Sequence, residues 1–163
     1  MNSRALPQGE EKTRYVRSMF DAIAPRYELV NRLMTFGLDV RWRRRAIRDL
    51  RLTPGSRVLD LASGTGDLCI ELDRQKMRPI SVDFSFGMLR ADHRSRAPRV
   101  QADVCVMPFP DAVADGVTCG FALRNFVDLG SFFDDLARVV RPGGRISLKV
   151  WIGGDTAYSA PPK

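Results

Sequence analysis

Hydrophobic positions change their spacing about one third of the way along the chain. Before that point the spacing is helical, because Val16, Met19, Phe20 and Ile23 recur at i, i+3, i+4 and i+7. This pattern predicts a helix with one apolar face. Pro25 is expected to interrupt it, since proline has no amide hydrogen and restricts the residue before it.

A second apolar set follows between Tyr27 and Phe36, and Gly37 is a stop signal. Asp39 is predicted to cap a further helix that runs to Leu50. The Pro54–Gly55 pair then indicates a turn. We therefore expect a helical lid or substrate region over residues 12–57, after a disordered lead over residues 1–11.

From residue 58 onward, short apolar runs alternate with helix-like segments. The predicted strands are 58–62, 79–83, 99–102, 114–120 and 145–150, and the predicted helices are 67–76, 87–94 and 131–140. This alternation is typical of an α/β fold with a parallel, doubly wound sheet. The predicted core spans residues 58–150, with a tight turn at Pro142-Gly143-Gly144. Residues 151–163 show neither the helical nor the strand spacing of apolar residues, and they are expected to form an unstructured tail.

Composition indicates a soluble domain, with 44% hydrophobic and 28% charged residues among 163. No apolar run approaches the roughly 20 residues that span a bilayer, and the first thirty residues do not resemble a secretory signal. A cytoplasmic location is the expectation. The three cysteines, Cys69, Cys105 and Cys119, are widely spaced, and His93 is the single histidine. No metal site is predicted.

The excess of positive over negative charge is confined to the first third of the chain. Residues 1–57 carry 13 Lys/Arg and 6 Asp/Glu, whereas residues 58–163 carry 13 of each. Such a segment suits anionic lipid headgroups, nucleic acid or an acidic partner. The alternative is a solvated helix face bearing arginines 41, 43, 44, 45 and 48. No nucleic-acid-binding motif accompanies the charge, so nucleic acid is not an expected partner.

The glycine-containing turn after the first predicted strand carries the main chemical signal. Gly64-Thr65-Gly66 opens a helix there, and glycines let backbone amides approach a ligand closely. The full GxGxxG spacing of dinucleotide sites is absent, because position 69 is cysteine. Asp67 would also disfavour a pyrophosphate. These details favour S-adenosylmethionine over NAD. Asp60 is predicted to hold the ammonium of that ligand, directly or through water, or to be a structural carboxylate.

Polar residues follow three further strands. Asp83 is predicted to accept the ribose hydroxyls, with a helix N-cap as the alternative. Asp103 is predicted to accept the adenine amino group, with a solvated loop acid as the alternative. Arg124 and Asn125 are catalytic candidates that would stabilise an anionic substrate oxygen. Their alternative role is to brace the loop.

Several segments together resemble the ubiquinone/menaquinone C-methyltransferase family. They are residues 19–27 (MFDAIAPRY), 31–33, 37–39, 42–43, 59–68 (LDLASGTGDL), 83–85 with 88–89, 102–103, 108–109, 121–125 (FALRN) and 138–144. The glycine turn and the PGG turn occur in many methyltransferases. The MFDAIAPRY segment and the LRN triplet are much more specific to this family.

The resemblance implies a Rossmann-like class I S-adenosylmethionine-dependent methyltransferase fold with N-terminal helices. It implies methylation of a ring carbon in a lipid-tailed quinol, demethylmenaquinol to menaquinol. The family's cofactor contacts carry over to Thr65, Asp83, Asp103, Val104 and Gly120. The family usually has serine where this chain has Gly120, and often alanine where it has Val104. A lipid-tailed substrate suits a basic, aromatic N-terminal segment as a lid and as a peripheral membrane contact.

The resemblance stops near Leu148, and Lys149 stands where the family has an acid. Family members continue with a helix and an antiparallel hairpin, so the terminal hairpin is expected to be missing. This departure leaves two alternatives open: a methyltransferase for a soluble small molecule, or a truncated, non-catalytic cofactor-binding module. A fifth strand with a free edge also predicts marginal stability or self-association as a homo-oligomer.

Overall fold

The computed structural model describes residues 11, 14–24 and 38–149. A helix occupies residues 14–24, and helix α2 spans Leu38–Leu50. The rest of the predicted lead, the second apolar set of residues 27–36 and the predicted tail lie outside the described residues. The first predicted helix is confirmed as far as residue 24.

Five parallel strands form one sheet in the order β3-β2-β1-β4-β5. They are β1 (Arg57–Leu61), β2 (Arg78–Asp83), β3 (Arg99–Gln101), β4 (Ala114–Gly120) and β5 (Val140–Lys149). The predicted parallel, doubly wound sheet is confirmed. Strand β1 has β2 on one side and β4 on the other, so the chain reverses its winding direction there. In such sheets, ligands bind at the carboxyl ends of the strands beside the reversal.

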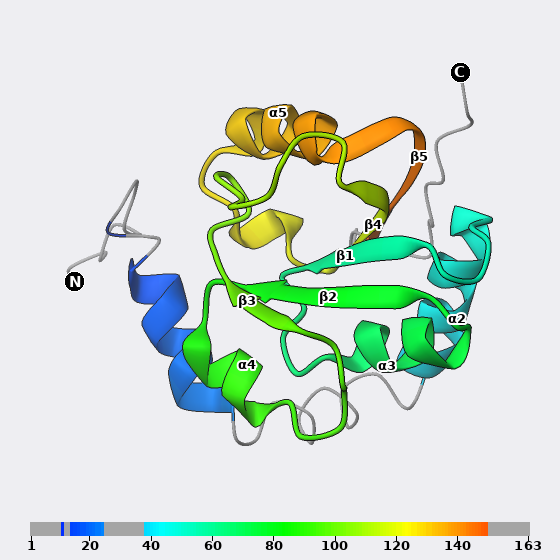
Figure 1. The fold of residues 1–163 in the computed structure, drawn as a ribbon. Helices are drawn as coiled ribbons and strands as arrows, with labels where there is room; N and C mark the ends of the chain where they lie inside the picture. Colours follow the sequence, from blue (N-terminus) through cyan, green and yellow to red (C-terminus); the bar gives the residue numbers. More distant parts are fainter. Residues whose placement is uncertain (1–10, 12–13, 25–37, 150–163) are drawn as a thin grey trace, which may run out of the picture.

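Helices α3 (Asp67–Arg74) and α4 (Phe86–Ala91) cross from β1 to β2 and from β2 to β3, whereas α5 (Leu129–Val139) connects β4 to β5. Parallel crossovers are right-handed, so opposite winding directions put the helices on opposite faces. Figure 1 shows α5 on one side of the sheet and α3 and α4 on the other. Helix α2 contacts α3, β4 and β5.

Alternating side chains of β1 divide the core into two layers. Leu59 and Leu61 are fully buried in a cluster with Phe132 and Leu136 of α5, whereas Val58 joins α2 and α3 on the other face. Asp60 has the same parity as Val58 and therefore points toward α3. Each buried leucine contributes roughly 1.5–3 kcal/mol of hydrophobic stabilisation.

Two boundary predictions were wrong. Helix α2 begins at Leu38, so Asp39 lies inside its first turn and not at the N-cap position. Strand β5 begins at Val140 and not at Arg145, because α5 passes directly into it. The PGG turn lies inside this strand: Ala114 pairs with Val140, and the next register pair is Gly116 with Arg145. The intervening residues bulge, with Gly143 at φ +76°.

Candidate functional site

The glycine-containing turn lies between β1 and α3, as predicted. Gly64 and Gly66 have φ of +55° and +78°, and Ala62 has φ +50° although it has a side chain. A Cβ at Gly66 would collide with the Asp92 carboxylate. A non-glycine residue in this conformation is costly and tends to occur at functional sites. The turn therefore has left-handed backbone conformations, one of them at a non-glycine residue, and these bring its amides to the edge of the sheet.

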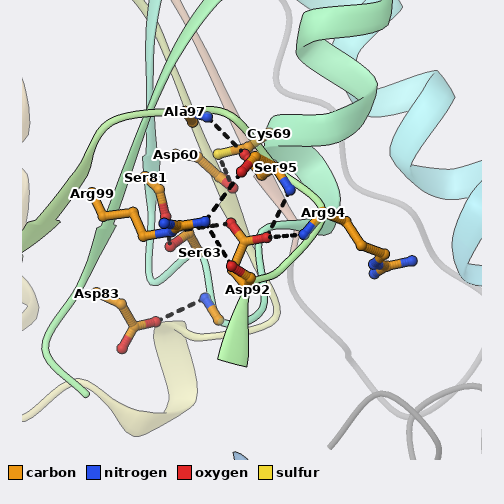
Figure 2. Close-up of polar contacts among 11 residues, drawn as sticks. Asp60, Ser63, Cys69, Ser81, Asp83, Asp92, Arg94, Ser95, Ala97 and Arg99 are labelled. Atoms are coloured by element: carbon orange, nitrogen blue, oxygen red, sulfur yellow. Dashed lines mark hydrogen bonds and ion pairs between the residues drawn. The ribbon is translucent and has the colours of Figure 1, made fainter. Parts of the chain in front are cut away.

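Asp92 packs behind the turn and is 2% exposed. Its Oδ1 accepts hydrogen bonds from the backbone N–H groups of Arg94 and Ser95, and its Oδ2 lies 3.5 Å from Nε of Arg99 (Figure 2). This ion pair lacks the geometry of a hydrogen bond. Asp92 thus packs directly against Gly66 and leaves no room there for a side chain.

Asp83 connects the second strand to the turn. Its Oδ2 accepts from the backbone N–H of Gly64 at 2.8 Å, and its Oδ1 accepts from the N–H of Ser85 at 2.8 Å. The residue is 5% exposed, and burial raises the pKa of its carboxyl. Ser85, not Asp83, caps α4, since its side chain accepts from the N–H of Met88. The carboxylate is held in a fixed orientation.

Asp60 is fully buried beneath the turn. Its Oδ1 accepts from the Thr118 hydroxyl at 2.7 Å, and its Oδ2 accepts from the Cys69 thiol at 3.4 Å. Burial raises the pKa of this carboxyl to about 7. The donors are a hydroxyl and a thiol and not the loop amides expected of a structural carboxylate. Asp60 is not among the residues that line the cleft, and its contact with a ligand stays a prediction.

A cleft of about 640 Å³ opens at the carboxyl ends of the strands. Eight of the ten predicted site residues line it, whereas Asp60 and Gly66 do not. The eight are Gly64, Thr65, Asp83, Asp103, Val104, Gly120, Arg124 and Asn125. These eight residues, which were predicted from the sequence, follow the carboxyl ends of four strands, β1 to β4, and the fold places them around one cleft.

At one end of the cleft, Asp103 and Val104 follow β3. Val104 is buried, and Asp103 is exposed, with its Oδ1 accepting from the N–H of Cys105 at 2.9 Å. Burial raises the pKa of the Cys105 thiol to about 11, so this cysteine stays protonated at neutral pH. Asp103 is the acid that this end presents to a ligand.

At the other end, Arg124 and Asn125 lie in a short 3-10 helix after β4, Leu123–Asn125. Arg124 is exposed, and it forms no ion pair within the described part of the chain. Phe121 precedes them at φ +61°, and its ring lies 6.1 Å from that of Trp42. Arg124 and Asn125, the two candidates for charge stabilisation, therefore lie close in sequence to an aromatic pair that lines the cleft.

The helix of residues 14–24 closes the apolar side of the cleft. All four residues of its predicted apolar face line it: Val16, Met19, Phe20 and Ile23. Asp21 holds this helix against α4, because its Oδ1 accepts from the Ser85 hydroxyl at 2.5 Å and from the Gly87 N–H at 2.8 Å. The docking is tight, since a Cβ at Gly87 would lie 2.9 Å from Cα of Asp21.

Sequence reasoning did not include several polar residues that contribute to this site, among them Asp21, Arg43 and Lys149. A solvated helix face was one of two alternatives for the arginines of α2, yet Arg43 lines the cleft and its Nη2 lies 2.8 Å from Oδ2 of Asp67. Lys149, the partner of Gly120 in the β4–β5 register, also lines the cleft. Within the described residues, no cluster of His, Cys, Asp or Glu side chains is suited to hold a metal ion.

Comparison with known sequences gives a family match across most of the chain. The model of the ubiE/COQ5 methyltransferase family matches residues 8–150. A demethylmenaquinone methyltransferase of Mycobacterium marinum is 44% identical over 137 residues, which cover 84% of this chain and 59% of that protein. A ubiquinone/menaquinone biosynthesis C-methyltransferase UbiE of Geobacter sulfurreducens is 43% identical over 146 residues, covering 83% and 57%. The chain thus spans less than two thirds of the length of these curated relatives.

Solved structures share the fold. A methyltransferase in complex with the Trm112 methyltransferase activator, from Haloferax volcanii, aligns with a TM-score of 0.69 at 24% identity, covering 80% of this chain and 59% of that chain. A phosphoethanolamine N-methyltransferase 2 of Haemonchus contortus, solved with S-adenosyl-L-methionine, aligns with a TM-score of 0.62 at 20% identity, covering 66% and 27%. At these identities the likeness concerns the fold alone.

Proposed function

Because the chain belongs to the ubiE/COQ5 methyltransferase family, we propose that it binds S-adenosylmethionine in the cleft and methylates a ring carbon of a lipid-tailed quinol, demethylmenaquinol to menaquinol. The observation that carries the cofactor proposal is Asp83. Its buried carboxylate has one backbone hydrogen bond on each oxygen and still lines the cleft. Each oxygen keeps a further lone pair for a hydroxyl.

The residues around Asp83 fit a nucleoside. Asp103 offers an acceptor for an exocyclic amino group, and the buried side chain of Val104 packs beside it. No atom lies within 4 Å of a Cβ built on Gly64, so the turn leaves open space for a ligand. We infer that the ribose binds Asp83 and the adenine binds between Asp103 and Val104.

When bound, S-adenosylmethionine supplies an electrophilic methyl group. The chain must position the ring carbon and favour the phenolate form of the quinol. Arg124 is the cation placed to stabilise a phenolate oxygen, and Asn125 adds amide donors beside it. Trp42 and Phe121 provide flat apolar surface against which a quinol ring can pack.

The lipid tail of such a substrate favours contact with a membrane surface. Within the described residues, no helix has the length and apolar character needed to cross a bilayer. The rim of the cleft instead exposes Met19 and Ile23. Tyr15, Arg14 and Arg17 are exposed on the same helix, and Phe86 is exposed at the start of α4. Apolar side chains flanked by arginines suit an anionic interface. Co-sedimentation with vesicles containing phosphatidylglycerol, compared with neutral vesicles, tests this contact.

Two other functions share the cofactor site. A soluble methyl acceptor would not need the apolar rim. A non-catalytic module would bind the cofactor without turnover. The decisive test is transfer of labelled methyl from S-adenosylmethionine to demethylmenaquinol. Binding of cofactor without transfer to this or a soluble quinol favours the module.

Arg124→Ala tests the role of the arginine within that assay. We expect the rate of methyl transfer to fall roughly 100-fold, by about 2.7 kcal/mol, because removing one charge-stabilising donor costs that order of magnitude. Affinity for S-adenosylhomocysteine, measured by calorimetry, should change less than twofold. Equal losses of rate and affinity would show that Arg124 only braces the pocket.

A further inference from the structure

Two positively charged side chains line the cleft at the ends of neighbouring strands. Arg124 follows β4, and Lys149 is the last residue of β5. Lys149 is half-buried, and Arg124 is exposed. Within the described residues, neither side chain has an ion-pair or hydrogen-bond partner. No acid in this part of the chain therefore neutralises either charge by direct contact.

The side chain of Lys149 lies on the face of the sheet that α2 and α3 cover. Lys149 pairs with Gly120 in the β4–β5 register, and residues paired in this way have their side chains on the same face. A Cβ on Gly120 would lie 3.3 Å from Leu68 of α3. The carbonyl oxygen of Lys149 accepts from the N–H of Phe121 at 2.8 Å, which fixes the end of β5 beside the cleft. Because Gly120 has no side chain, the cleft keeps space next to Lys149.

Apart from the ion pair between α2 and α3, the charged residues of the cleft are divided along the sheet, whose strand order is β3-β2-β1-β4-β5. Asp103 follows β3 and Asp83 ends β2, whereas Arg124 follows β4 and Lys149 ends β5. The cleft thus has a carboxylate half, Asp83 and Asp103, and a cation half, Arg124 and Lys149. Carboxylates accept from hydroxyl and amino groups, whereas the cation half is suited to an anion.

We propose that Lys149, together with Arg124, binds the methyl acceptor as its phenolate. The proposal rests on the proposed function, which assigns the carboxylate half to the nucleoside and leaves the cation half for the acceptor. A quinol becomes nucleophilic at a ring carbon when a hydroxyl loses its proton, and nearby cations stabilise the resulting oxygen. The ammonium group has three donors on a flexible stem, so it can follow the position of that oxygen. Lys149 therefore makes the site select an acceptor that carries a negative charge.

Two ring analogues that differ in charge test this role. 4-nitro-1-naphthol is ionised at mildly alkaline pH, and its methyl ether has the same ring without the charge. Titrations of the full chain with S-adenosylhomocysteine bound should show that Lys149→Met weakens binding of the naphtholate roughly tenfold. The same variant should change the affinity for the ether, and for S-adenosylhomocysteine, less than about twofold.

Arg145→Met is the matched control. Arg145 lies in the same strand and pairs with Gly116, so its side chain is on the same face as that of Lys149. It is exposed and does not line the cleft. The control removes one positive charge from β5, and both analogues should bind as they do to the unaltered chain. If thermal melting shows that Lys149→Met does not fold, Lys149→Gln, which also lacks the charge, takes its place.

Three outcomes would overturn the role of Lys149. Equal weakening of both analogues by Lys149→Met would show that the lysine only shapes the cleft. Equal losses in Lys149→Met and Arg145→Met would show a general effect of the charge of the chain. An unaltered chain that binds S-adenosylhomocysteine without preferring the naphtholate to the ether would have no receptor for an anion. Failure of the unaltered chain to bind S-adenosylhomocysteine would instead remove the proposed function.

Discussion

The two buried aspartates at the carboxyl edge of the sheet differ in what they face. Asp83 lines the cleft, whereas Asp60 faces Thr118 and Cys69 inside the protein. Burial raises the pKa of both carboxyls, to about 7 for Asp60. Burial therefore does not distinguish the carboxylate that faces the cleft from the one that faces the interior, whereas the direction of the side chain does.

Replacement of Asp83 tests the ribose assignment. Asp83→Ala should weaken binding of S-adenosylhomocysteine by about 1.5–3 kcal/mol, roughly tenfold to a hundredfold, because it removes charged acceptors. Calorimetry measures the loss, and thermal melting checks that the variant is folded. Asp73→Ala, at an exposed position of α3, is the control and should bind normally. Unchanged affinity in Asp83→Ala would remove the ribose assignment.

Asp60 predicts a specific dependence of stability on pH. Its folded-state pKa of about 7 lies above the usual value of 3.8, so the native state holds a proton that the unfolded chain releases. The stability linked to this proton is complete below about pH 4 and is lost as the pH rises toward 7, by at most about 1.4 kcal/mol per pH unit.

Asp60→Asn should lack this loss. Burial also raises the pKa of Asp83, which adds a slope of the same sign, so the measured quantity is the difference between the two chains. Urea denaturation between pH 4 and 7 should show the unaltered chain losing stability faster than Asp60→Asn. Parallel curves would mean that Asp60 is ionised in the folded protein at low pH.

At the scale of elements, the local signal at the glycine-containing turn predicted the structure correctly, whereas contacts between distant segments were not predicted. The strand, glycine turn and helix around Gly64 are contiguous, so their spacing predicted the turn. Asp21 lies 64 residues before Ser85, and Arg43 lies 24 before Asp67. The spacing of apolar residues in the helix of residues 14–24 and in α2 does not indicate which distant side chain each helix will contact. The start of β5 was misplaced because the PGG signal marks a bulge and not a strand end.

The contact of Asp21 with α4 predicts how the N-terminal helix is held. Asp21→Ala should lower the free energy of unfolding by about 1–2 kcal/mol, since it removes acceptors for Ser85 and Gly87 at a partly exposed site. Hydrogen exchange should become faster over residues 14–24 and stay unchanged in β1 and β4. The control, Asp49→Ala, removes an exposed pair with Arg45 and should change stability by less than about 0.5 kcal/mol. Uniformly faster exchange across the chain would contradict a role of Asp21 that is limited to holding the helix of residues 14–24.

At the scale of the whole molecule, the sheet edge formed by β5 determines how the chain is expected to associate with other copies. In the described part of the chain, β5 pairs with β4 along one edge only. The strand has ten residues, and Ile146 within it is 47% exposed. A long edge with exposed apolar side chains is a template for pairing with another chain.

A polypeptide of these 163 residues should therefore self-associate as its concentration rises. Ile146→Lys should shift light scattering toward the monomer, because a charge on an edge strand opposes pairing. Val106→Lys, which puts the same charge on a 76% exposed apolar residue outside the strands, is the control and should leave association unchanged. Equal effects of both variants would point to nonspecific charge repulsion. A monodisperse, unaltered monomer melting well above about 45–65 °C would show that the edge of β5 is protected.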